Sequence, residues 1–295
     1  MKELKATNKN NKRYDDLVFM DIETTGLTHQ NPIVSITVSD GVNTVTKVIE
    51  NLKDELELIS DFLEKYNGSN FVTYNGESFD LPFIRQRAKF YNMEFDYEST
   101  DLYKYFNKYR YLFPMKSLRQ VEVEKYFEID RGEDISGAEV VDLFRSHIEN
   151  YDESILDTIG THNLKDVEGL VYLYENRFLI HRENRIELGD NYLEIRDISM
   201  DHDTLKLKGV TTFKDVFLNS KDYLLNVAEG EFTLDIYTKS GKYSKNLICN
   251  YVLKKDFPVE VSDLKAPDEV VILNLKSVEM FNLKSVVRYI CKDLK

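Results

Sequence analysis

Residues 19–27 read Phe19-Met20-Asp21-Ile22-Glu23-Thr24-Thr25-Gly26-Leu27, and they follow the apolar pair Leu17-Val18. The apolar residues from Leu17 to Ile22 predict a short strand. Because side chains alternate along a strand, Asp21 and Glu23 would lie on the same face. Two carboxylates held this close repel each other, and a divalent cation such as Mg²⁺ or Mn²⁺ would remove the repulsion. The run therefore indicates an acidic metal-binding pair, although an isolated pair of this kind also occurs in turns that end a strand.

A second acidic motif lies at the start of a predicted helix. Residues 74–80 read Tyr74-Asn75-Gly76-Glu77-Ser78-Phe79-Asp80. An apolar strand over 70–74 ends there, and a helix over 79–91 follows it. Asp80 would lie in the first helical turn, where the helix dipole favours a carboxylate. The position suits a metal ligand, and it also suits a residue that only caps the helix.

A third motif, His162-Asn163-Leu164-Lys165-Asp166, lies within a helix predicted over 156–181 with a break at Gly160. Residues four apart lie on the same side of a helix, so His162 and Asp166 would face one site. The alternative is a surface helix that carries a single histidine.

The pattern of the whole chain predicts an α/β domain followed by a mainly β domain. Up to residue 186 we expect strands at 17–22, 32–39, 44–49 and 70–74, and helices at 54–66, 79–91, 101–113, 117–127, 136–150 and 156–181. Beyond it we expect strands at 205–208, 231–237 and 243–253, a hairpin turn at Ser240-Gly241 and a closing helix at 282–294. The predicted organisation is a disordered lead-in over 1–14, a first domain over 15–186 and an accessory domain over 187–295.

Composition narrows the class of protein. The formal net charge of −13 argues against tight, sequence-independent binding of duplex nucleic acid, which needs a basic face. It leaves open an enzyme that handles strand ends through metal ions. No apolar run has the length of a membrane span, no signal peptide is visible, and the two cysteines form no metal motif. We therefore expect a cytoplasmic protein that does not enter membranes.

Together and in this order, the three motifs resemble those of the DEDD 3′→5′ exonuclease superfamily, which is ribonuclease-H-like and DnaQ-like. The likeness is strongest to its YprB-like branch and covers about residues 15–180. It rests on Phe19 to Leu27 with Met20 in place of Leu, on Tyr74 to Phe83, on Asp134 to Glu139 with Ser136 in place of Pro, and on His162 to Val167.

The resemblance implies a ribonuclease-H-like α/β domain with a mixed central sheet and flanking helices, joined to a smaller, mainly β C-terminal domain. It implies two Mg²⁺ or Mn²⁺ ions per site, held by Asp21, Glu23, Asp80 and Asp166. His162 would be the general base, and the residues that bind substrate would be Thr24, Asn75, Phe79 and Asp101. Histidine-bearing members usually place the base five residues before the last aspartate. The spacing in this chain is four, as in the tyrosine-bearing group, so the identity of the base stays open.

The function that follows is metal-dependent 3′→5′ hydrolysis of single-stranded DNA or RNA ends. Two alternatives come from other classes. One is a nucleic-acid or protein-binding module that retains the fold. The other is a phosphatase, because D-x-E-x-T at Asp21 resembles the D-x-D-x-T of haloacid-dehalogenase-type enzymes, in which the first aspartate is the nucleophile. Glu23 stands where that family has a second aspartate.

Overall fold

A computed structural model of the chain describes residues 1–8, 12–113, 115, 117–132 and 135–294. These residues group into two units, each with its own hydrophobic core. The first unit consists of Met1–Asn107 and Ser117–Asn176, and the second of Lys108–Lys116 and Arg177–Lys295. The segment Lys108–Lys116 thus groups with the C-terminal residues, although it lies inside the domain predicted over 15–186.

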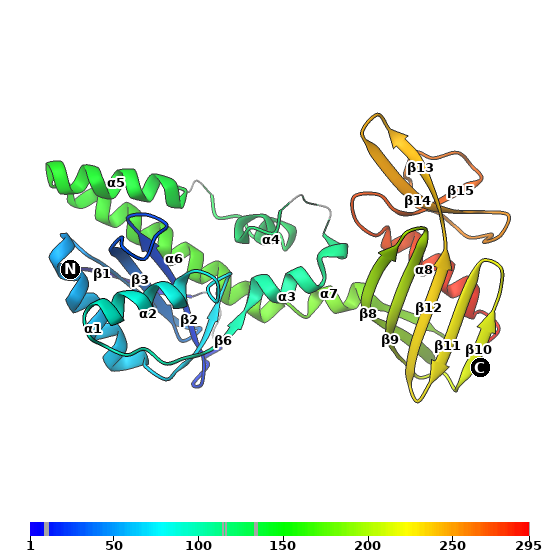
Figure 1. Cartoon of the computed structure of the whole chain (residues 1–295), viewed down its shortest axis with the longest axis horizontal. Coiled ribbons are helices and arrows are strands. Elements are labelled where there is room, and N and C mark those ends of the chain that lie inside the picture. The colour runs from blue at the N-terminus through cyan, green and yellow to red at the C-terminus, as the bar shows by residue number, and fades with distance from the viewer. Residues whose placement is uncertain (9–11, 114, 116, 133–134, 295) are drawn as a thin grey trace. The chain divides into compact units, whose positions relative to one another are not determined.

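A mixed sheet of six strands forms the centre of the first unit (Figure 1). Its order is β1-β4-β3-β2-β5-β6, with bounds β1 (Lys2–Thr7), β2 (Val18–Thr24), β3 (Ile33–Ser39), β4 (Asn43–Val48), β5 (Asn70–Thr73) and β6 (Glu98–Asp101). β2 pairs in parallel with β5, as β5 does with β6, whereas the other pairs are antiparallel. The predicted mixed sheet is confirmed.

Strand β1 corrects one prediction. Residues 1–14 were expected to be a disordered lead-in, which is wrong for Lys2–Thr7, because these residues pair with β4 from Lys2 to Thr7 without a gap. Leu4 packs on the core of the first unit and reaches Gly160. The strand lies at the edge of the sheet, where one side of its backbone and one face of its side chains can stay polar. Residues 9–11 of the same prediction lie outside the described residues.

The helices of the first unit match most of the predicted segments. They are α1 (Glu55–Tyr66), α2 (Asp80–Phe90), α3 (Leu102–Lys108), α4 (Gln120–Tyr126), α5 (Gly137–Asn150) and α6 (Glu153–Asn176), with a short 3-10 helix η1 (Leu52–Asp54) before α1. Helix α6 continues through Gly160 without a break. The predicted capping box forms at the start of α5, where Ser136 and Glu139 cap each other. Asp134, which belongs to the same motif, lies outside the described residues.

Helices α1 and α6 cover opposite faces of the sheet. Thr37 of β3 donates a hydrogen bond to Asn163 of α6, whereas its neighbours Ile36 and Val38 face α1. Successive residues of a strand point to opposite faces, so β3 is sandwiched between the two helices. This explains why six of its seven residues are buried and one is partly buried.

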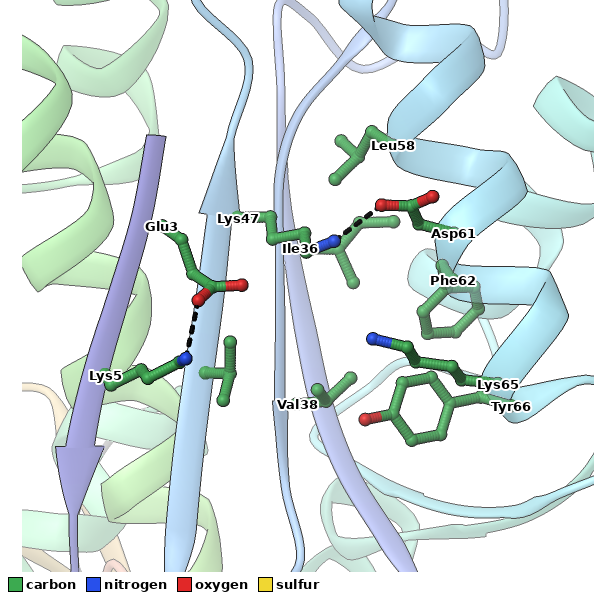
Figure 2. A pocket seen from close by; sticks show the side chains of 11 residues that line it. Glu3, Lys5, Ile36, Val38, Lys47, Leu58, Asp61, Phe62, Lys65 and Tyr66 are labelled. Atoms are coloured by element: carbon green, nitrogen blue, oxygen red, sulfur yellow. Dashed lines mark hydrogen bonds and ion pairs between the residues drawn. The ribbon is translucent and has the colours of Figure 1, made fainter. Parts of the chain in front are cut away.

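A groove of about 200 Å³ lies beside α1, over strands β1, β4 and β3, on the face of the sheet that α1 covers (Figure 2). Its floor is apolar, and charged side chains from β1, β4 and α1 stand around it. Lys47 pairs with Asp61 at 2.6 Å, and Lys5 pairs with Glu3 at 2.7 Å. Charged residues on an edge strand oppose pairing with another sheet, which suits the position of β1.

The second unit is rich in β-structure. Its larger sheet is antiparallel, with the order β10-β11-β12-β9-β8-β7 and bounds β7 (Arg185–Leu188), β8 (Asn191–Asp201), β9 (Thr204–Thr211), β10 (Val216–Asn219), β11 (Tyr223–Ala228) and β12 (Glu231–Tyr237). A three-stranded sheet contains β13 (Lys239–Ser244), β14 (Leu247–Leu253) and β15 (Val270–Asn274). The helices are η2 (Arg110–Leu112), α7 (Leu179–Asn184) and α8 (Met280–Cys291).

Two local predictions in this part of the chain are wrong. Ser240 and Gly241 lie within β13, paired with Asn250 and Cys249, so the hairpin turns five residues later than predicted, between Ser244 and Leu247. The single helix predicted over 101–113 is two short helices, α3 and η2. The second of these carries Tyr111, which packs on the core of the second unit, and the backbone carbonyl of Tyr111 accepts a hydrogen bond from the amide of Val278 at 3.0 Å.

Within the described part of the chain, no helix is long and apolar enough to cross a membrane.

Candidate metal centre

Four carboxylates meet at the end of strand β2. Asp21 and Glu23 stand on β2 itself, Asp80 is the first residue of α2, and Asp166 comes from α6. Asp80 is fixed against the strand because its Oδ1 accepts a hydrogen bond from the backbone amide of Ile22 at 3.1 Å. The three motifs thus bring their acidic residues to one place, from one strand and two helices.

The orientation of Asp21 is set by a buried amide. Nδ2 of Asn163 donates to Oδ2 of Asp21 at 2.6 Å. Oδ1 of Asn163 accepts hydrogen bonds from the hydroxyls of Ser35 at 2.9 Å and Thr37 at 2.6 Å. Because two hydroxyls hold the oxygen end, the nitrogen end must face Asp21. The sequence prediction missed Asn163, and its only signal was a place beside His162 in the third motif.

His162 lies between two of the carboxylates. Its Nε2 is 3.2 Å from Oε1 of Glu23 and 3.3 Å from Oδ2 of Asp166. One ligand atom from each of these three residues lies within 4.8 Å of the others, a spacing that can hold a metal ion. The helical spacing of four residues is what places the imidazole beside Asp166.

Arg131 brings a guanidinium to this acidic cluster. It forms ion pairs with Asp166 and with Glu124 of α4, and only 7% of its side chain is exposed. Burial lowers the pKa of the Arg131 guanidinium, but the two carboxylates outweigh this and the net shift is upward. No sequence motif marked either Arg131 or Glu124.

The charges of the cluster are not balanced. Burial raises the pKa of Asp21 well above its ordinary value, and Asp80, Asp166 and Glu23 raise it further, against the opposing effect of Arg131. Burial also raises the pKa of Asp80 to about 7, although the amide of Ile22 acts in the other direction. At neutral pH the cluster therefore favours a bound proton or a bound cation. Carboxylate oxygens with one imidazole form a donor set that suits a divalent cation such as Mn²⁺ or Mg²⁺.

Asp101, predicted to contact substrate, makes hydrogen bonds to backbone amides. Its carboxylate accepts from the amides of Asn75 at 2.8 Å, Tyr103 at 2.9 Å and Glu77 at 3.3 Å. These bonds shape the turn that precedes Asp80. The same turn contains Asn75 in a left-handed conformation, with a φ of 64°.

The other two predicted substrate contacts lie beside the cluster. Thr24 follows Glu23 on β2, and its hydroxyl donates to the carbonyl of Gly26 at 2.8 Å. Phe79 precedes Asp80, and its ring packs against Phe83 with centroids 5.3 Å apart. Both are close in sequence to a carboxylate of the cluster, and their contact with substrate stays a prediction.

A mixed α/β fold with carboxylates gathered at the end of a central strand is the arrangement of ribonuclease-H-like proteins. Residues 18–177 match the RNase H superfamily, and because the match covers more than half of the chain, the chain belongs to this superfamily. The fold is therefore nuclease-like, and it is one that typically uses divalent metals on nucleic acids.

Comparison with individual proteins does not narrow the assignment beyond the superfamily. No curated protein matches the chain. Among solved structures, the family B DNA polymerase from the hyperthermophilic archaeon Pyrobaculum calidifontis is similar at 21% identity with a TM-score of 0.44. The similarity covers 56% of this chain and 25% of the polymerase, so it spans about a quarter of that protein.

Proposed function

We propose that the chain is a divalent-metal-dependent 3′→5′ exonuclease of the DEDD type, in the YprB-like branch, that acts on single-stranded DNA or RNA ends. The observation that carries the proposal is the cluster itself. Asp21, Glu23, Asp80 and Asp166 occur in the order of the exonuclease motifs and lie together with a histidine among them.

Each residue has a role in the proposed reaction. Asp21, Glu23, Asp80 and Asp166 would hold two Mg²⁺ or Mn²⁺ ions. When bound, such ions polarise the phosphate and make water a stronger nucleophile. Asn163 keeps Asp21 turned toward the site, and the amide of Ile22 does the same for Asp80.

In the proposed reaction, His162 accepts a proton. A water oxygen attacks the phosphorus of the last phosphodiester and one water proton passes to the imidazole. The bond from phosphorus to the 3′ oxygen breaks, the leaving 3′ oxygen takes a proton from solvent, and the imidazolium then releases its proton to solvent. The products are a 5′-mononucleotide and a strand one residue shorter with a free 3′ hydroxyl. His162 lies against Glu23 and Asp166, so its Nε2 faces the space where the cations would be held.

A panel of end-labelled DNA and RNA oligonucleotides with Mg²⁺ or Mn²⁺ tests the proposal. We expect stepwise shortening from the 3′ end and no cutting of circular single strands. Asp21→Asn and Asp166→Asn should abolish turnover without loss of fold. Efficient cleavage of circles, or full activity in these variants, would contradict the proposal. Metal binding without activity on any oligonucleotide would favour the binding module, and trapping of a phosphate on Asp21 would favour the phosphatase, which superfamily membership does not support.

A further inference from the structure

Among the described residues, Arg131 contacts Glu124 and Asp166 unequally. Its Nε and Nη2 both donate to the carboxylate of Glu124, whereas only Nη1 donates to Oδ1 of Asp166. Glu124 is almost fully buried, with 1% of its side chain exposed. A two-bond pair between a guanidinium and a carboxylate has fixed geometry, so Glu124 anchors Arg131 independently of Asp166.

Helix α6 is shaped to receive this pair. Gly169 lies three residues after Asp166, and a Cβ on it would stand 2.0 Å from Oε1 of Glu124 and 3.1 Å from Nη2 of Arg131. Gln120 of α4 adds a second tie, because its side-chain amide donates to Oε1 of Glu124 at 2.8 Å and to the carbonyl of Asp166 at 2.6 Å. The guanidinium of Arg131 is therefore held against α6 by Glu124, which Gln120 holds in turn, and neither of these residues belongs to the carboxylate cluster.

The two oxygens of Asp166 consequently face different partners. Oδ1 is held by Arg131, and Oδ2 lies 3.3 Å from Nε2 of His162, on the side where Glu23 also lies. A cation bound among Glu23, His162 and Asp166 can reach Oδ2 without displacing the anchored guanidinium.

We infer that Arg131 is a positioning residue that occupies Oδ1 of Asp166, so that this carboxylate binds a divalent cation through Oδ2 alone. The inference rests on the proposed function for its effect on turnover. It also predicts the direction in which metal affinity changes when Arg131 is replaced. Removing Arg131 takes away the positive charge that contacts Asp166 and frees Oδ1 of this carboxylate, so the cation should bind more tightly. The same change loses the fixed geometry of the ligand, so turnover should fall.

The test uses the full chain with the double substitution Glu124→Met/Arg131→Met. Replacing the buried Glu124–Arg131 pair by apolar side chains of similar size removes both of its charges, so the fold should persist, while Asp166 loses its contact with the guanidinium. Mn²⁺ affinity is measured by calorimetry, and turnover is measured on a labelled oligonucleotide. We expect affinity to rise several-fold while kcat falls by at least ~10-fold. The matched control is Asp142→Met/Arg145→Met, which removes an exposed pair on α5 and should change neither quantity.

Only tighter Mn²⁺ binding together with slower turnover supports the inference. Weaker or unchanged binding shows that Arg131 has a structural role alone, and unchanged turnover shows that it positions nothing. If the double variant does not fold, Glu124→Gln/Arg131→Gln is tested instead. It also removes both charges but keeps side chains that can form hydrogen bonds, so tighter Mn²⁺ binding and slower turnover are again expected. If the wild-type chain degrades no oligonucleotide, the proposed function fails, whereas the Mn²⁺ titration still decides whether Arg131 restrains Asp166.

Discussion

Asn163 on α6 and Asp21 on β2 are joined by a hydrogen bond of 2.6 Å, although 142 residues separate them in sequence. The amide spans the interface between helix and sheet, since its oxygen end is held by hydroxyls of β3. Strand β2 and helix α6, which carries Asp166, are thereby held in one position relative to each other. Asn163 is completely buried, so no water replaces these bonds.

Asn163→Ala should therefore damage both stability and activity. It leaves Ser35, Thr37 and Asp21 without a shared partner, which should lower the free energy of unfolding by about 1–3 kcal/mol. Turnover should fall by about 10²-fold because Asp21 loses its orientation. Denaturant unfolding and oligonucleotide assays measure the two effects. Asn176→Ala is the control at the exposed end of the same helix and should behave as wild type. Full activity in Asn163→Ala would show that Asp21 needs no orienting amide.

The pH dependence of stability follows from Asp80. Its pKa in the folded, metal-free protein is raised to about 7 by burial, above the value of roughly 4 for a carboxyl in an unfolded chain. Between these values the folded protein binds more protons than the unfolded chain. Asp80 should therefore make the free energy of unfolding fall as the pH rises from about 4 to about 7 in the absence of metal, and this contribution is measured as the difference between wild type and Asp80→Asn. Asp21 shifts in the same direction and adds to the trend.

Thermal unfolding across this pH range, with a chelator or with Mg²⁺, measures the effect. Mg²⁺ needs the ionised carboxylates, so the stabilisation that it provides should increase as the pH passes through 7. Asp80→Asn should flatten the metal-free profile and reduce the Mg²⁺ effect. If the difference in stability between the metal-free wild type and Asp80→Asn stays constant from pH 4 to pH 7, the assignment of Asp80 to a buried, cation-binding cluster is wrong.

The parts of the site that the sequence predicts are those that depend on local periodicity. Alternation along a strand places Asp21 beside Glu23, and the helical repeat places His162 beside Asp166. Arg131 and Asn163 could not be predicted in the same way, because their partners are distant in sequence and are brought near only by tertiary packing.

The two strands of the first sheet that the sequence did not predict have a common physical cause. β1 and β6 are the two edges of the first sheet, and both are short and mostly polar. An edge strand is held by backbone hydrogen bonds to one neighbour, so its side chains need not form an apolar run. The central strands β2 and β3 are covered on both faces, and their apolar residues made them visible.

Asp101 should affect the site through the turn and not through the metal. Its carboxylate accepts three backbone amide hydrogen bonds around the turn before Asp80. Asp101→Asn should lower the free energy of unfolding by about 1–3 kcal/mol and slow turnover, with the number of Mn²⁺ ions bound unchanged. Asp96→Asn, at an exposed position near β6, is the control. Loss of a bound Mn²⁺ in Asp101→Asn would identify Asp101 as a metal ligand.

Measurements of turnover and of Mn²⁺ affinity can distinguish proton transfer from metal binding as the role of His162. The imidazole Nε2 lies near both Glu23 and Asp166, so the geometry suits a general base and also a ligand. If His162 is the base, His162→Ala should lose at least ~10²-fold in turnover while Mn²⁺ affinity changes little. If it is a ligand, Mn²⁺ affinity should fall together with turnover. Because the spacing of four residues matches the tyrosine-bearing exonucleases, His162→Tyr should retain more activity than His162→Ala. Activity of His162→Ala within a few-fold of wild type would exclude the base, and the hydrolysis would then depend on the carboxylates and their cations alone.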